Sequence, residues 1–242
     1  MTGESDEVDK TVKWVADKGV NYGYAYDEDL KLFGKLGLNS FPSAILVDPF
    51  GNVVYSGHPS RLSEELIDET LANVLPAPMG EWPEALAPVA DKLTMGHFGP
   101  AKRALGALEA SELTAQVGMF IDKTVDVRVA GISAMVEDLD VAGAMAALEG
   151  HADVFAGYDS VLSNLGGMAK TLESDRAKAA LAAQEKLVEL EAKIKASGRK
   201  LEMEDMKSML AEYQKIATDF EGKAPGKAAA TWVSQLERAL KG

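Results

Sequence analysis

The chain has 242 residues, 47% hydrophobic and 26% charged, an ordinary composition for a globular protein of one large or two small domains. Its formal net charge of −13 argues against nucleic acid or an anionic membrane as the main partner, since both repel an acidic surface. No apolar run approaches the roughly 18 residues that suggest a membrane span.

The first predicted element is a helix over residues 5–18. Val8, Val12 and Val15 recur at helical spacing and form one apolar face, and Gly19 ends the helix. A second, short helix is expected over residues 30–36.

Residues 36–59 form the most informative stretch of the chain. Pro42 stands just ahead of an apolar strand over residues 44–48, and a second strand follows over residues 52–55. The Pro and Gly between them, in residues 48–51, are typical of a tight turn. Two strand-forming runs with so short a connection predict a β-hairpin.

A third helix is predicted over residues 64–75, with Ser63 as its cap. Its apolar stripe consists of Leu66, Ile67, Leu71 and Val74. The next stretch contains four of the nine prolines of the chain, at positions 76, 78, 83 and 88. Such density cannot continue a helix, so residues 76–88 are predicted to be a proline-rich linker.

Residues 89–242 are rich in Ala, Leu, Met, Glu and Lys and show no convincing strand, which predicts an α-helical domain. The expected helices cover about residues 85–95, 100–110, 112–137, 141–149, 152–166, 168–197, 203–219 and 226–241, with a break at Gly166–Gly167. A phenylalanine near a glycine recurs at Phe98, Phe155 and Phe220, which resembles degenerate tetratricopeptide-like hairpins. An ordinary α-helical domain is the alternative.

Taken in order, the first 75 residues resemble the second half of a thioredoxin fold, of the redoxin or cytochrome-maturation type of thiol–disulfide oxidoreductase. The shared pattern is a loop glycine, a hydrophobic residue before a proline, an apolar strand ending in Asp, a glycine turn and a second strand. Here it comprises Gly37, Phe41, Pro42, residues 44–48, Gly51 and residues 53–55, flanked by residues 2–5, 20–27 and 57–59. The resemblance implies a cis Phe41–Pro42 bond and an α+β chain, with a partial thioredoxin-like α/β unit over residues 1–75 followed by the all-α domain.

The chain contains no cysteine, whereas thioredoxin chemistry needs a thiolate nucleophile in a Cys-X-X-Cys motif. In the family that motif lies upstream of the residues matched here, so we expect a thioredoxin-like domain that lacks its cysteine-motif half. Truncation of a longer redox protein is the favoured interpretation, and a natural remnant without redox function is the alternative. Either way, we expect this chain to be catalytically inactive by itself.

The resemblance assigns substrate binding to Phe41, Pro42 and Ser43, which would present backbone groups to a substrate strand. No catalytic residue and no cofactor is predicted. His58, His97 and His151 are too far apart in sequence for metal-ligand spacing. The acidic cluster of residues 27–29 lacks the spacing of a calcium loop and is interpreted as a solvated loop.

Two functions follow from these observations. The first is a thiol–disulfide oxidoreductase of redoxin type, incomplete in this chain, and the second is a non-enzymatic module that binds proteins through its helical domain. Expected partners are proteins or peptides, or a second copy paired through the open edge of the strand over residues 44–48. The acidic first ten residues are unlike a signal peptide, which predicts a cytoplasmic location unless an upstream signal directs a longer form outside the cytoplasm.

Overall fold

The computed structural model describes residues 8–19, 27, 31–38, 40–72, 74–75, 79–197 and 201–241. The structure is 73% helical and contains a small two-stranded antiparallel sheet, so the fold class is α+β. The chain divides into two compact units, unit 1 (Met1–Val74) and unit 2 (Leu75–Gly242).

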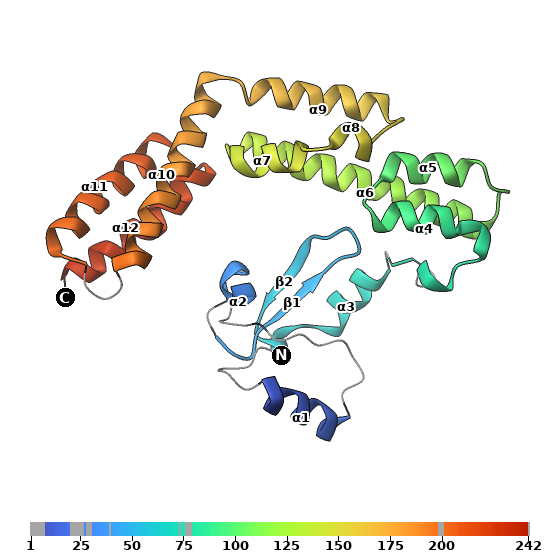
Figure 1. Cartoon of the computed structure of the whole chain (residues 1–242), viewed down its shortest axis with the longest axis horizontal. Coiled ribbons are helices and arrows are strands. Elements are labelled where there is room, and N and C mark those ends of the chain that lie inside the picture. The colour runs from blue at the N-terminus through green and yellow to red at the C-terminus, as the bar shows by residue number, and fades with distance from the viewer. Residues whose placement is uncertain are drawn as a thin grey trace. The chain divides into compact units, whose positions relative to one another are not determined.

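Unit 1 combines three short helices with a hairpin. Its elements are α1 (Val8–Lys18), α2 (Lys31–Lys35), β1 (Ala44–Val47), β2 (Val53–Gly57), the 3-10 turn η2 (Pro59–Arg61) and α3 (Glu64–Leu71) (Figure 1). In α1, Val15 is buried but Val12 is 48% exposed, so the predicted apolar face is wrong at Val12. The residues at which this helix was predicted to begin, and residues 2–5 and 20–26 of the resemblance, lie outside the described residues.

The predicted hairpin is confirmed. β1 and β2 pair antiparallel, with Ala44 opposite Gly57 and Leu46 opposite Tyr55, and the register shifts between Leu46 and Val47. At the turn, the Asp48 N–H donates to the Asn52 carbonyl at 2.9 Å. Residues 40–43 directly precede β1 and form the loop that leads into the hairpin.

Helix α3 begins as predicted and ends earlier. The Ser63 hydroxyl accepts a hydrogen bond from the Leu66 N–H at 3.2 Å, which confirms the cap. The helix ends at Leu71, and in the turn that follows the Val74 N–H donates to the Leu71 carbonyl at 3.0 Å. Leu71 is 57% and Val74 50% exposed, so the predicted apolar stripe is wrong at its C-terminal end.

The described part of unit 2 consists of helices and turns, without a strand. After the 3-10 turns η3 (Met79–Glu81) and η4 (Glu84–Leu86) come α4 (Ala87–Thr94), α5 (Phe98–Gly106), α6 (Glu112–Glu137), α7 (Val141–Leu148), α8 (His151–Val154), α9 (Asp159–Thr171), α10 (Asp175–Ser197), α11 (Met203–Asp219) and α12 (Ala224–Lys241) (Figure 1).

The predicted helices over residues 152–166 and 168–197 do not match the structure, and the helix predicted over residues 100–110 ends earlier, at Gly106. Gly166 and Gly167 lie inside α9 rather than at a break. The chain turns instead at Phe155–Tyr158, where Gly157 has a φ of +99°, a conformation that side-chain-bearing residues rarely adopt. A second turn, over residues 172–174, separates α9 from α10. The Ser174 hydroxyl accepts the Ala177 N–H at 3.2 Å and so caps α10.

Unit 2 contains two hydrophobic cores. The first lies among α4, α5, α6 and α9, around Val89, Val117, Ile121 and Leu165, which are essentially inaccessible to solvent. The second lies among α7, α10, α11 and α12, and Tyr213 is its largest fully buried side chain. The helices of unit 2 therefore bury two apolar cores, which stabilise the unit through packing.

A glycine close to the start of a helix recurs in both cores. A Cβ at Gly99 of α5 would overlap the backbone of Ala156, and a Cβ at Gly226 of α12 would overlap the Phe220 carbonyl. The turn contacted in each case contains a buried phenylalanine, Phe155 in the first core and Phe220 in the second. Glycine is required at both positions because backbone approaches backbone there.

Candidate functional site

The loop of the three predicted substrate-binding residues runs directly into β1. The Phe41–Pro42 peptide bond is cis, which confirms the prediction for that bond. Phe41 is 50% exposed, Pro42 is exposed and Ser43 is half-buried. The structure thus places the three residues together in one accessible segment at the entrance of the hairpin.

A stacked aromatic pair holds this loop. The Phe41 ring lies on the Phe33 ring of α2, with centroids 4.5 Å apart and planes at 20°. The Asp27 carboxylate in turn accepts the N–H groups of Leu32 and Phe33 at 2.8 Å each, and so binds the free donors at the start of α2. Asp27 lies in irregular backbone and is half-buried, and its side chain anchors the helix that carries Phe33. Residues 28 and 29 lie outside the described residues.

The loop backbone is available for pairing. Within the described part of the chain, no residue forms a backbone–backbone hydrogen bond with Phe41 or Ser43. The Ser43 hydroxyl donates to the Ser40 carbonyl, which fixes the bend just before β1. Unpaired backbone groups beside a strand can pair with an extended peptide.

The hairpin turn is held by the carboxylate of Asp48. One of its oxygens accepts the N–H groups of Phe50 and Asn52 at 2.9 and 2.8 Å, and the other accepts the Asn52 amide at 3.0 Å. Burial would raise the pKa of Asp48, but these hydrogen bonds, with a further one from Gly51, outweigh it and hold the pKa below its usual value. The charged form of Asp48 is thus the form that stabilises the turn.

Two of the three histidines have structural side-chain contacts. His58 caps η2, and its Nδ1 accepts the Ser60 N–H at 3.2 Å. The Nδ1 of His151 lies within hydrogen-bond distance of the Leu148 carbonyl oxygen. In the described residues, no group of three or more His, Asp or Glu side chains is placed to hold a metal ion.

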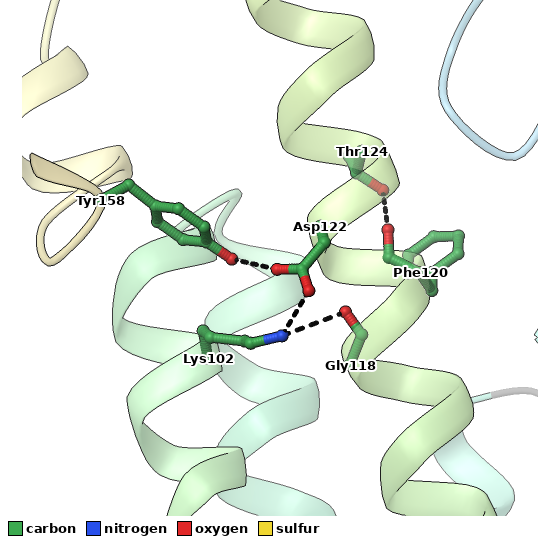
Figure 2. Close-up of polar contacts among 6 residues, drawn as sticks. All are labelled: Lys102, Gly118, Phe120, Asp122, Thr124 and Tyr158. Atoms are coloured by element: carbon green, nitrogen blue, oxygen red, sulfur yellow. Dashed lines mark hydrogen bonds and ion pairs between the residues drawn. The ribbon is translucent and has the colours of Figure 1, made fainter. Parts of the chain in front are cut away.

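Unit 2 contains a polar network that joins three parts of its first core (Figure 2). Asp122 of α6 accepts hydrogen bonds from Lys102 of α5 and, at 2.8 Å, from the Tyr158 hydroxyl, which precedes α9. The Lys102 ammonium also donates to the Gly118 carbonyl at 3.4 Å. Burial, the bond to Asp122 and the charges of Asp122 and Asp126 all raise the pKa of Tyr158, so this residue stays a neutral donor.

Comparison of the chain with protein-family models, curated proteins and solved structures found no match. Among the described helices none is both long and apolar enough to cross a lipid bilayer.

Sequence reasoning found the loop residues and missed those that hold them. Phe33 falls in the predicted short helix, and a single aromatic residue in such a helix gives no local signal of a stacking partner. Asp27 did carry a signal, since an Asp just ahead of a helix start is a typical capping residue. The Lys102–Asp122–Tyr158 network joins positions too far apart in sequence for any spacing rule.

Proposed function

We propose that unit 1 is the peptide-binding part of a thioredoxin-like thiol–disulfide oxidoreductase of redoxin type. Phe41, Pro42 and Ser43 contact the backbone of an extended substrate beside β1. The observation that carries this proposal is the loop itself, which is exposed, is anchored through Phe33 and has unpaired backbone among the described residues.

The proposal assigns binding, and not electron transfer, to these residues. In thiol–disulfide exchange a thiolate attacks one sulfur of a disulfide and expels the other sulfur as a thiolate. No residue of this sequence supplies a thiol. Reduction of insulin by dithiothreitol should therefore proceed at the uncatalysed rate when the chain is added.

An extended peptide is the occupant that fits the hairpin. β2 is the one strand neighbour of β1 among the described residues, so a further strand can extend the sheet from the loop along β1. Phe41 then supplies apolar contact at the end of the added strand. A second copy of the chain, paired edge to edge, is the competing occupant.

The test uses the reduced, carboxymethylated B chain of insulin, an extended peptide with blocked thiols, labelled with fluorescein. Fluorescence anisotropy measures its binding to the wild-type chain, to Phe41→Ala and to the control Val188→Ala. Val188 is a 68% exposed apolar residue of α10 in unit 2. We expect Phe41→Ala to weaken binding about tenfold and Val188→Ala to change it less than about twofold.

Equal effects of the two substitutions, or no binding by the wild-type chain, would contradict the proposal. Sedimentation velocity without peptide tests the competing occupant, because edge-to-edge pairing of two copies gives a dimer, whereas peptide binding to one copy does not.

A further inference from the structure

A groove between α6 and α9 in unit 2 has an apolar floor. It encloses about 480 Å³, a volume typical of binding pockets. Val129 of α6 and Val161 and Met168 of α9 form the floor, and all three are half-buried against the first core. The floor therefore belongs to the packed scaffold and keeps its shape.

The rim of the groove is polar, and Asp126 is the one acidic residue among the described residues that line it. Asp126 is exposed, and no described residue forms a hydrogen bond or an ion pair with its carboxylate. Two turns further along α6, the Ser133 hydroxyl donates to the Glu137 carboxylate at 3.1 Å. No lysine or arginine is among the described residues that line the groove.

Further negative charge lies beside Asp126. Asp122 is one helical turn away and is exposed, although Lys102 compensates part of its charge (Figure 2). The charges of Asp122 and Asp126 both act on the Tyr158 hydroxyl, so the two carboxylates share this end of the groove. A cation entering here is attracted chiefly by Asp126, because Asp122 is paired with Lys102.

From this combination we infer that the α6–α9 groove binds a basic amphipathic helix of a partner protein. Apolar side chains of that helix pack on Val129, Val161 and Met168, and its lysines or arginines lie beside Asp126 and Glu137. Along α6 these two acids are about 16 Å apart at 1.5 Å per residue, which matches about three turns of a bound helix. The inference does not depend on the Phe41–Ser43 loop.

The test uses a fluorescein-labelled synthetic peptide with leucines along one helical face and lysines elsewhere, at 0.15 M salt. Asp126→Lys and Glu185→Lys change the net charge of the chain equally, and Glu185 is an exposed residue of α10 outside the groove. We expect Asp126→Lys to weaken binding about tenfold and Glu185→Lys less than about twofold. Met168→Gln alters the floor without altering the charge and should weaken binding about threefold.

Equal losses for the two lysine substitutions would overturn the inference, because they would show general attraction by an acidic protein. Undetectable binding to the wild-type chain would overturn it too, as would equal binding of a peptide with glutamates in place of the lysines. Circular dichroism of each variant establishes that the helices are intact, and Met168→Gln remains informative if Asp126→Lys does not fold.

Discussion

Unit 1 and unit 2 differ in where they place their apolar side chains. In the described part of unit 1, Val15 is the one buried hydrophobic residue, and large apolar side chains are exposed on every helix and both strands whose side chains are described. These are Val12, Trp14, Leu32, Leu36, Phe41, Val47, Val53, Val54, Leu71 and Val74. In unit 2 the large exposed apolar residues are Val188 and the methionines Met79, Met95, Met119, Met145 and Met203.

This difference indicates that the two units have different roles, binding in unit 1 and structural support in unit 2. A two-stranded hairpin with little covered apolar surface is marginally stable, and exposed apolar patches mark places where other polypeptides bind. Unit 2 buries two cores of its own and needs no such cover. We therefore expect unit 1 to gain most of its stability on binding, and unit 2 to be the rigid scaffold.

The largest effect on stability is expected at two glycines of unit 2, where neighbouring backbone leaves no room for a Cβ atom. Gly226→Ala forces a Cβ into the Phe220 carbonyl, and Gly99→Ala forces one into the Ala156 backbone. Each should destabilise unit 2 by about 3 kcal/mol, measured by urea unfolding. Gly131 of α6 has open space around it, so Gly131→Ala is the matched control and should stabilise the chain by about 0.5–1 kcal/mol. A loss for Gly131→Ala equal to the other two would mean that helix geometry, and not backbone contact, selects glycine.

The hairpin of unit 1 should lose its turn in acid. The folded-state pKa of Asp48 is lowered, so its contribution is present above the unfolded pKa of about 4 and is lost as the pH falls through the folded value. Asp48→Ala, which removes the hydrogen bonds that the carboxylate accepts in the turn, should cost about 1–2 kcal/mol and abolish that pH dependence. Amide exchange of residues 44–57 measures both. Unchanged exchange in acid would show that other contacts hold the turn.

A smaller effect is expected at the polar network of unit 2. Tyr158→Phe removes the bond to Asp122 and should cost about 1 kcal/mol. Because the pKa of Tyr158 is raised, this stability is fully present below the unfolded pKa of about 10 and is lost as the pH rises through the folded value. Absorbance at 295 nm follows tyrosine ionisation, and the spectral difference from Tyr158→Phe should be absent near pH 10 and appear only at higher pH. A difference that appears by pH 10 would contradict the buried, acid-flanked hydroxyl.

The smallest effect concerns Tyr213 in the second core. Its hydroxyl is buried and has no hydrogen-bond partner among the described residues, and burial together with the charge of Glu191 raises its pKa to about 12. Tyr213→Phe removes an unsatisfied polar atom and keeps the stacking on Trp232, so it should be neutral or stabilising by up to about 1 kcal/mol. A lower melting temperature for Tyr213→Phe would reveal a partner for the hydroxyl.

The sequence predicted what local chemistry decides. The hairpin, the cap at Ser63 and the extent of α6 follow from turn residues, a capping hydroxyl and apolar spacing, and the structure confirms them. The sequence-based prediction was wrong where tertiary packing determines the secondary structure. Gly166 and Gly167 remain helical because α9 packs against the first core through Leu165, and this contact overrides the low helix propensity of glycine.

For the candidate site, too, the sequence predicted the residues that form a local pattern and missed the contacts that depend on the fold. Phe41, Pro42 and Ser43 were identified from a contiguous pattern, whereas the stacking of Phe33 on Phe41 depends on how the chain between them folds back. The groove between α6 and α9 could not be foreseen either, since residues from two helices line it and the boundaries of α9 were themselves predicted wrongly.

The most direct test of the central claim replaces Phe41 with the photoreactive amino acid benzoylphenylalanine. Irradiation in the presence of the carboxymethylated insulin B chain, followed by mass spectrometry, locates the cross-links. Peptide binding at the loop predicts that position 41 cross-links to the peptide and that the same replacement at the more exposed Val188 in unit 2 does not. Cross-linking of equal yield from both positions, or from position 188 alone, would contradict peptide binding at the Phe41–Ser43 loop.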